Sequence, residues 1–139
     1  VTLGIEAINR FETDLVNTAA QAVQMANDVN EKNVGVLLDT YHMNMEEKHI
    51  GVSLQKSKEK FIHLHCVEND RGVPGSGHIP WSEVFNTLKA MNYNGWLTLE
   101  LFIQANEAVS PDLAIWRDIE ADPTEAARQG LQFLRENTK

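Results

Sequence analysis

Four short apolar segments divide the chain, and longer stretches with helical spacing separate them. The segments are Leu3–Ile8, Val34–Met43, Lys60–Val67 and Trp96–Phe102. Apolar runs without alternation are typical of strands covered on both faces, as in the parallel sheets of α/β proteins. We therefore predict four buried strands, each of which ends in polar or ionisable residues.

Helical periodicity fills the intervals between these segments. Apolar or small residues recur with helical spacing in Thr13–Val29 and Trp81–Met91, and Asn44–Lys58 is amphipathic. A last helix is predicted to open with Asp122 as its cap and Pro123 at the first helical position. A strand followed by a helix, four times in succession, predicts an α/β fold with a parallel sheet and right-handed crossovers.

The third segment has a period of two, which assigns its side chains to faces. It predicts Phe61, His63 and His65 on one face, and Ile62, Leu64 and Cys66 on the other. We expect His63, one layer deeper than His65, to be a buried and hydrogen-bonded structural residue. Cys66 is expected to be a small core residue.

Size and composition indicate one soluble globular domain, residues 1–139. The composition is 42% hydrophobic and 23% charged, and no apolar run is long enough to span a bilayer, so we expect no membrane insertion. A lone Cys66 and the lack of a leader segment favour a reducing cytoplasm. The chain starts inside a strand without an initiator Met, which suggests a piece of a longer protein.

Charge further limits the classes of partner. The formal net charge is −8 at pH 7 and the pI is about 5.0. Binding to a phosphate backbone needs a cationic surface, so we expect no nucleic-acid partner.

Each predicted strand carries one ionisable residue at or near its C-terminal end. These residues are Glu6, Asp39, His65 and Glu100. The C-terminal ends of parallel strands converge on one rim, so the four side chains are predicted to be neighbours. Three carboxylates would repel one another without a positive charge between them. Three carboxylates with one imidazole suit a divalent cation: manganese is favoured, magnesium and cobalt stay open, and zinc is a less natural choice.

The sequence resembles the ketose 3-epimerases of the tagatose/psicose (allulose) type, which belong to the xylose-isomerase-like TIM barrel superfamily. The motifs that carry the resemblance are, in chain order, Glu6 with Asn9-Arg10-Phe11-Glu12, Leu38-Asp39-Thr40-Tyr41-His42-Met43-Asn44, His63-Leu64-His65 with Glu68 and Arg71, Pro74-Gly75-Ser76-Gly77, Pro80-Trp81, Glu100-Leu101-Phe102 and Trp116-Arg117-Asp118. The resemblance extends from about Leu3 to Leu134. The family is an eight-stranded β/α barrel, so it implies a (β/α)4 half-barrel here, equivalent to the last four units.

The resemblance also implies a role for each matched residue. Glu6, Asp39, His65 and Glu100 would bind the divalent metal, and Glu6 and Glu100 would be the catalytic acid–base pair on opposite faces of the sugar. The implied reaction is deprotonation and reprotonation beside the ketone through a metal-stabilised enediolate. The residues implied to contact the substrate are Glu12, His42, Arg71 and Phe102.

The implied substrate is a small ketose. Arg71 is the only evident cation in the site, and no Gly-rich phosphate-binding turn opens a helix, so an unphosphorylated sugar is preferred. Three alternatives stay open: an aldose–ketose or inositol-pathway isomerase of the same superfamily, a catalytically inactive half-barrel that retains the metal site, and, least favoured, a DNA-repair endonuclease with several zinc ions.

A half-barrel would expose apolar residues of its inner face, such as Phe61, and two unpaired strand edges. Proteins avoid such surfaces. We therefore expect the chain to self-associate, as a homodimer.

Overall fold

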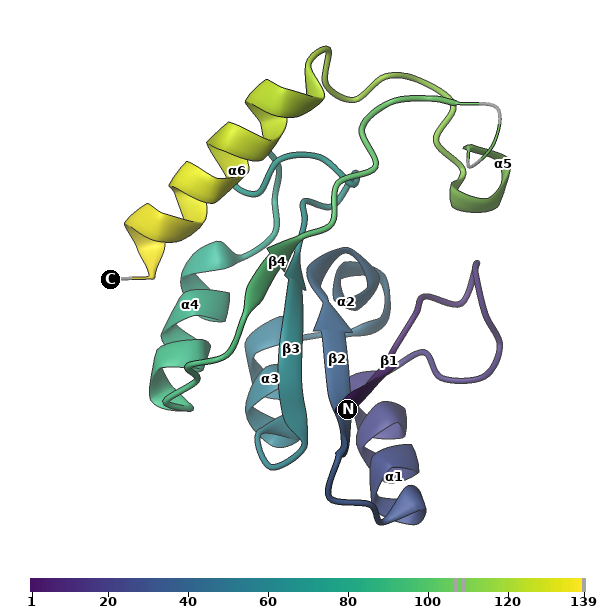
Figure 1. The fold of residues 1–139 in the computed structure, drawn as a ribbon, viewed down its shortest axis with the longest axis vertical. Coiled ribbons are helices and arrows are strands. Elements are labelled where there is room, and N and C mark those ends of the chain that lie inside the picture. The colour runs from purple at the N-terminus through teal and green to yellow at the C-terminus, as the bar shows by residue number, and fades with distance from the viewer. Residues whose placement is uncertain (107, 109, 139) are drawn as a thin grey trace.

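The sheet is parallel and its strands lie side by side in chain order (Figure 1). The computed structural model describes residues 1–106, 108 and 110–138. Within them the strands are β1 (Leu3–Glu6), β2 (Val34–Asp39), β3 (Phe61–Cys66) and β4 (Leu97–Leu99). The helices are α1 (Ala19–Val29), α2 (Thr40–Glu46), α3 (Ile50–Ser57), α4 (Trp81–Ala90), α5 (Ser110–Leu113) and α6 (Pro123–Asn137). The predicted (β/α)4 arrangement is confirmed.

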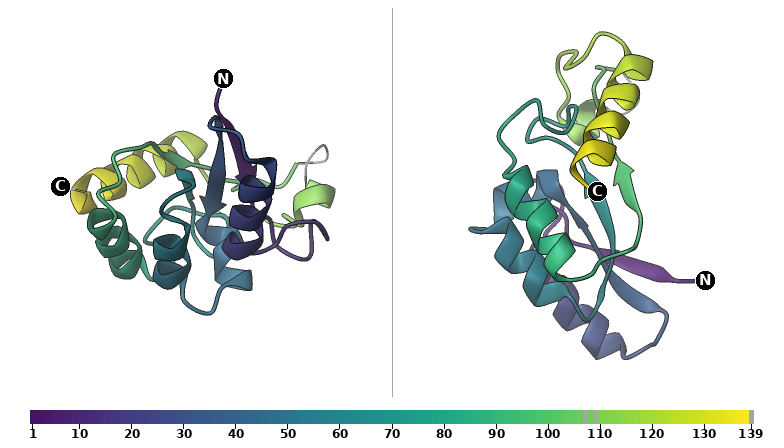
Figure 2. Two further views of the ribbon diagram at one scale, coloured as in Figure 1. Left: turned by 90° about the horizontal axis from the view of Figure 1, so that it is seen from below. Right: turned by 90° about the vertical axis from the view of Figure 1, so that its left-hand side faces the viewer.

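Helices α1, α3 and α4 cover one face of the sheet, as Figure 2 shows. The core lies between them and the strands, where Val36, Leu38 and Leu64 are completely buried. We call the opposite face of the sheet the inner face. The strand register places on it Gly4, Glu6, Gly35, Leu37, Asp39, His63, His65 and Thr98.

A β-bulge in β3 corrects the predicted orientation of Phe61. Val36 pairs with Phe61 but Leu37 pairs with His63, so β3 has one extra residue at Ile62. The extra residue reverses the alternation, so Phe61 is 7% exposed in the core and Ile62 is 36% exposed. The prediction of Phe61 on the inner face was therefore wrong, whereas those of His63 and His65 are confirmed.

Two predicted helices have different bounds in the structure. Helix α1 begins at Ala19, not at Thr13, because Thr18 and Gln21 form a capping box at that point. The predicted helix Asn44–Lys58 is two helices, α2 and α3, separated by an extended segment with Glu47 and His49 in β conformation.

The strands are shorter than the apolar runs predicted. The run Val34–Met43 contains a strand only as far as Asp39, because the Asp39 side chain caps α2 and turns the chain into a helix. The predicted strand Trp96–Phe102 is ordered as a strand over Leu97–Leu99. Asp122 and Pro123 open α6 as predicted.

Buried Glu68 organises the loop between β3 and α4. Its carboxylate accepts hydrogen bonds from the backbone N–H groups of Ile79 (2.7 Å) and Gly75 (2.8 Å) and from the indole Nε1–H of Trp81 (2.8 Å). Glu68 is 0% exposed. This one side chain therefore fixes the loop to the start of α4.

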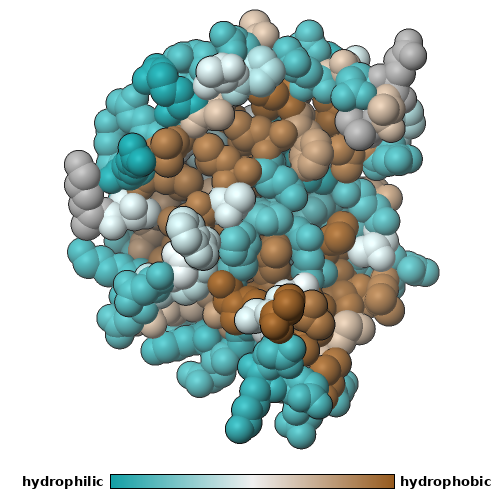
Figure 3. All heavy atoms as spheres, in the orientation of Figure 1, coloured by the Kyte–Doolittle hydropathy of each residue, from teal (hydrophilic) through white to brown (hydrophobic). Residues whose placement is uncertain are grey.

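Strands β1 and β4 are the two edges of the sheet. Figure 3 shows the surface seen in the orientation of Figure 1, where hydrophobic and polar side chains are mixed.

None of the helices in the described residues has the length and apolar character of a membrane span.

Candidate metal centre

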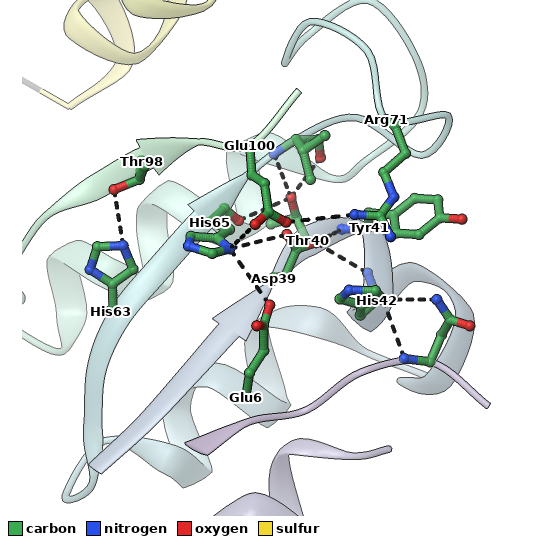
Figure 4. Close-up of polar contacts among 12 residues, drawn as sticks. Glu6, Asp39, Thr40, Tyr41, His42, His63, His65, Arg71, Thr98 and Glu100 are labelled. Atoms are coloured by element: carbon green, nitrogen blue, oxygen red, sulfur yellow. Dashed lines mark hydrogen bonds and ion pairs between the residues drawn. The ribbon is translucent and has the colours of Figure 1, made fainter. Parts of the chain in front are cut away.

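Glu6, Asp39, His65 and Glu100 converge at the C-terminal ends of the strands (Figure 4). One potential ligand atom from each residue lies within 4.8 Å of all the others. Nδ1 of His65 is 3.3 Å from Glu100 Oε1 and 3.6 Å from both Glu6 Oε1 and Asp39 Oδ2. The imidazole therefore faces all three carboxylates. The predicted neighbourhood of the four side chains is confirmed.

Asp39 divides its two oxygens between the fold and the cluster. Oδ1 accepts the backbone N–H groups of Tyr41 (2.7 Å) and His42 (3.2 Å) and so caps α2. Oδ2 is buried, faces His65 and has no hydrogen-bond partner within the described part of the chain. Burial raises the pKa of Asp39, and the neighbouring imidazole opposes this effect.

The carboxylates control the protonation of His65. Burial acts to lower the pKa of His65, but ion pairing with Asp39, Glu100 and Glu6 outweighs it and raises the pKa to about 11. Burial acts to raise the pKa of Glu100, but His65 reverses the balance and lowers it. The three carboxylates thus favour the protonated form of the His65 imidazole.

The residues present fit a divalent cation. Asp39 Oδ2 and His65 Nδ1 are both buried and have no hydrogen-bond partner among the residues that the structure describes, although buried polar atoms are normally paired. Both atoms are directed into the space that Glu6 and Glu100 also face. Three carboxylate oxygens with one imidazole nitrogen form a ligand set typical of a hard or intermediate divalent ion.

Arg71 connects this cluster to the rest of the rim. Its guanidinium donates to Glu12 through Nη2, at 2.8 Å from Oε1, and its Nη1 is 3.6 Å from Glu100 Oε2. The same group lies 4.0 Å above the centre of the Tyr41 ring and 4.9 Å from that of Phe102. The Arg71 side chain is 2% exposed. It is therefore held in one position by charge and by aromatic stacking.

His42 is buried beside the cluster, 3% exposed. Its Nδ1 is 3.2 Å from the backbone nitrogen of Asn9 and 2.8 Å from the Asn9 amide nitrogen. Burial lowers the pKa of His42, more than the neighbouring Asp39 raises it. His42 is thus favoured as a neutral imidazole.

All eight predicted site residues lie in one connected region, because Arg71 joins Glu12 and Phe102 to Glu100, and Asn9 joins Glu12 to His42. Sequence reasoning assigned no role to Tyr41 or Asn9. Asn9 lies shortly after the end of β1 and three residues before Glu12. This position in the sequence could have indicated that Asn9 lies at the site. The contact of Tyr41 with Arg71 depends on the tertiary structure.

The other histidines occupy less central places. His63 forms a hydrogen bond with Thr98 Oγ1 at 2.9 Å, as expected of a structural residue, but it is half-buried, not fully buried. His49 and His78 are exposed, and Cys66 is completely buried, as expected of a small core residue.

Comparison with known proteins gives consistent matches along the chain. A D-psicose 3-epimerase of Agrobacterium fabrum is 39% identical over 140 residues, covering 97% of this chain and 48% of the relative. An L-ribulose 3-epimerase of Mesorhizobium japonicum is 37% identical, covering 96% and 46%. A crystal structure of D-psicose 3-epimerase in the presence of D-fructose superposes with a TM-score of 0.94 at 38% identity, covering 99% of this chain and 50% of that one.

The chain thus spans about half the length of the curated relatives it matches. Its four parallel β/α units correspond to half of a TIM barrel. The family described as xylose isomerase-like TIM barrel matches residues 1–137. With this match and the converging strand ends, the chain belongs to the xylose isomerase-like TIM barrel family.

Proposed function

We propose that this chain is the catalytic half of a divalent-metal-dependent ketose 3-epimerase. The observation that carries the proposal is the convergence of Glu6, Asp39, His65 and Glu100, with two buried ligand atoms left unpaired. The names of the relatives, psicose and ribulose 3-epimerases, support the choice of a ketose. Residues 1–139 act as a single domain in this proposal.

Two carboxylates on opposite sides of the site can invert a carbon. The hydrogen at C3 of a ketose lies next to the carbonyl group, which makes it removable by a base. Glu6 comes from β1 and Glu100 follows β4, so the two reach the site from the two edge strands. One carboxylate removes the proton from one face of C3, and the other, in its acid form, returns a proton to the opposite face.

The four clustered residues are proposed to hold the cation, with manganese preferred and magnesium or cobalt as alternatives. When bound, the cation supplies Lewis-acid polarisation of the sugar oxygens beside C3. The capping bonds of Asp39 Oδ1 fix its carboxylate, so Oδ2 is held in place before any ligand arrives.

Glu12, His42, Arg71 and Phe102 are proposed to bind the sugar. Arg71 offers hydrogen-bond donors from a fixed position, and its buried Nε has no partner in residues 1–106, 108 and 110–138. Phe102 presents an aromatic surface beside the guanidinium. Donors and acceptors in this arrangement suit the hydroxyl groups of an unphosphorylated ketose.

Epimerisation of D-psicose and D-fructose in D2O tests the proposal, with the 139-residue chain and, where its gene extends further, the complete gene product. We expect turnover and deuterium incorporation at C3 with Mn²⁺ and neither after chelation. Glu6→Gln and Glu100→Gln are each expected to lower kcat about 10²- to 10⁴-fold, whereas Glu59→Gln, at an exposed position, should leave it unchanged. Turnover that survives chelation would overturn the metal dependence, and no turnover of either sugar or of L-ribulose by the complete product would overturn the reaction.

The half-length of the chain supports a second candidate, a catalytically inactive half-barrel that retains the metal site. Metal binding by the 139-residue chain without turnover, together with turnover by a longer gene product, would select this candidate. An aldose–ketose isomerase would instead move a hydrogen between C1 and C2 of the sugar, and neither it nor an inositol-pathway isomerase would invert C3.

We propose further that the isolated chain forms a homodimer. The support is structural: the edges β1 and β4 have no further strand partner within the described residues. Apolar Leu3 on β1 and Trp96, which directly precedes β4, are 56% and 80% exposed. Pairing of such edges is favourable for an exposed sheet. A monodisperse monomer in analytical ultracentrifugation would contradict this proposal.

A further inference from the structure

Asn9 uses every polar atom of its side chain beside the candidate site. It is 1% exposed and lies between β1 and α1, in the same segment as Glu12. Its Nδ2 is 2.7 Å from Glu12 Oε1 and 2.8 Å from His42 Nδ1, and its Oδ1 accepts the backbone N–H of Phe11 at 2.9 Å. The amide therefore has one consistent orientation, with Nδ2 as the donor to both site residues.

These contacts determine the tautomer of His42. The backbone N–H of Asn9 can only donate, and it points at His42 Nδ1 from 3.2 Å. The amide Nδ2 donates to the same atom. A ring nitrogen that accepts hydrogen bonds carries no proton, so the proton of the neutral imidazole is on Nε2.

The Nε2–H group of His42 is available to a ligand. Across residues 1–106, 108 and 110–138, no hydrogen bond from this atom is found, whereas Nδ1 is doubly engaged. Figure 4 shows the ring beside Asp39, on the side of the site toward Arg71. A donor at this place suits an oxygen atom of a bound sugar.

We propose that Asn9 is a positioning residue that fixes His42 as an Nε2–H donor and aligns it with Glu12. The pair His42 and Glu12 then offers one donor and one acceptor in a fixed relation, which suits a hydroxyl-rich ligand. The identity of that ligand rests on the proposed function, but the tautomer of His42 does not.

Long-range ¹H–¹⁵N correlation spectra of the histidine side chains test the tautomer directly in the protein without added metal. We expect His42 Nδ1 to be unprotonated in the unsubstituted protein. In Asn9→Asp, a carboxylate acceptor replaces the amide donor at 2.8 Å from Nδ1. Its negative charge outweighs the backbone donor that remains at 3.2 Å, so we expect a proton on Nδ1. In Asn9→Ala the backbone donor remains, so Nδ1 should stay unprotonated. A protonated Nδ1 in the unsubstituted protein would overturn the proposal whether or not any variant folds.

Kinetics with a ketose provide the second readout. We expect Asn9→Asp to lower kcat/KM about tenfold, equivalent to one net hydrogen bond, mainly through KM. Asn9→Ala should lose less.

Asn17→Ala is the matched control. Asn17 lies in the same segment and bonds the backbone oxygens of Ile8 and Thr13 without contacting His42. It should leave both the tautomer and KM unchanged. If the unsubstituted protein turns over the ketose and Asn9→Asp leaves KM unchanged, the positioning role is refuted but the proposed function is not. If His42 has the expected tautomer but no turnover is found, only the proposed function is refuted.

Discussion

At the scale of the residue, the double duty of Asp39 matters most. One oxygen caps α2 and the other remains unpaired in the cluster. The sequence predicted Asp39 as a site residue, and the structure shows that the same side chain also caps α2. The two roles can be separated by a substitution that keeps one oxygen and replaces the other.

Asp39→Asn makes that separation. Asn caps helices about as well as Asp, so we expect the free energy of unfolding to change by about 1 kcal/mol or less. The amide nitrogen cannot bind a cation, so Mn²⁺ affinity, measured by titration calorimetry, should fall by at least about a hundredfold.

Asp122→Asn is the matched control for Asp39→Asn. Asp122 caps α6 through the same pair of bonds, to the backbone N–H groups of Thr124 and Glu125, on an exposed helix end. Its replacement should leave Mn²⁺ affinity unchanged. Equal losses of affinity in both variants would show that Asp39 acts through the helix and not as a ligand.

At the scale of the element, the carboxylates of three glutamates join segments far apart in the chain. Glu47 accepts the backbone N–H of Ala19 at the start of α1, and Glu83 accepts that of Gly51 in the first turn of α3. A carboxylate at a helix N-terminus also interacts favourably with the helix dipole. Glu68 is the most connected of this group, because it binds both the loop and Trp81.

Glu68→Gln should destabilise the fold. In the variant, the amide NH2 group replaces one carboxylate oxygen and cannot accept a hydrogen bond. The buried N–H groups that this oxygen accepts in the unsubstituted protein are left unpaired, at a cost of about 1–3 kcal/mol each. We expect a loss of about 2–4 kcal/mol in urea unfolding. Glu83→Gln is the control, because Glu83 accepts the N–H of Gly51 alone among the described residues, and it should cost about 1 kcal/mol or less. If Glu68→Gln destabilises the protein no more than Glu83→Gln does, Glu68 does not hold the loop.

Much of the architecture and of the site could be predicted from the sequence. Strand ends converge by topology alone, so the positions of Glu6, Asp39, His65 and Glu100 followed from the order of elements. The bulge at Ile62 could not be predicted, because the apolar character of Phe61 fits either face of the sheet. The contacts of Arg71 with the Tyr41 and Phe102 rings could not be predicted either, because the two rings lie on segments far apart in the chain.

At the scale of the whole molecule, the sheet has two open edges and an inner face that no helix of the described residues covers. The edge strand β1 exposes Leu3. A charge on a strand edge opposes pairing with another strand. This provides a test of self-association that leaves the core intact.

Leu3→Lys should weaken self-association at least about tenfold, which is about 1.4 kcal/mol, as measured by sedimentation over a range of concentrations. Val52→Lys is the matched control, because Val52 is 49% exposed on α3, away from the edges. If both substitutions weaken association equally, the charge itself and not the edge is responsible.

The cluster spans the full width of the sheet, with Glu6 and Glu100 contributed by the two edge strands and Asp39 and His65 by the two central ones. A cation bound by all four residues would thus connect the two outermost strands of the sheet. Linkage then makes the two events reciprocal: any factor by which a strand paired with β1 or β4 changes cation affinity equals the factor by which the cation changes the affinity for that strand.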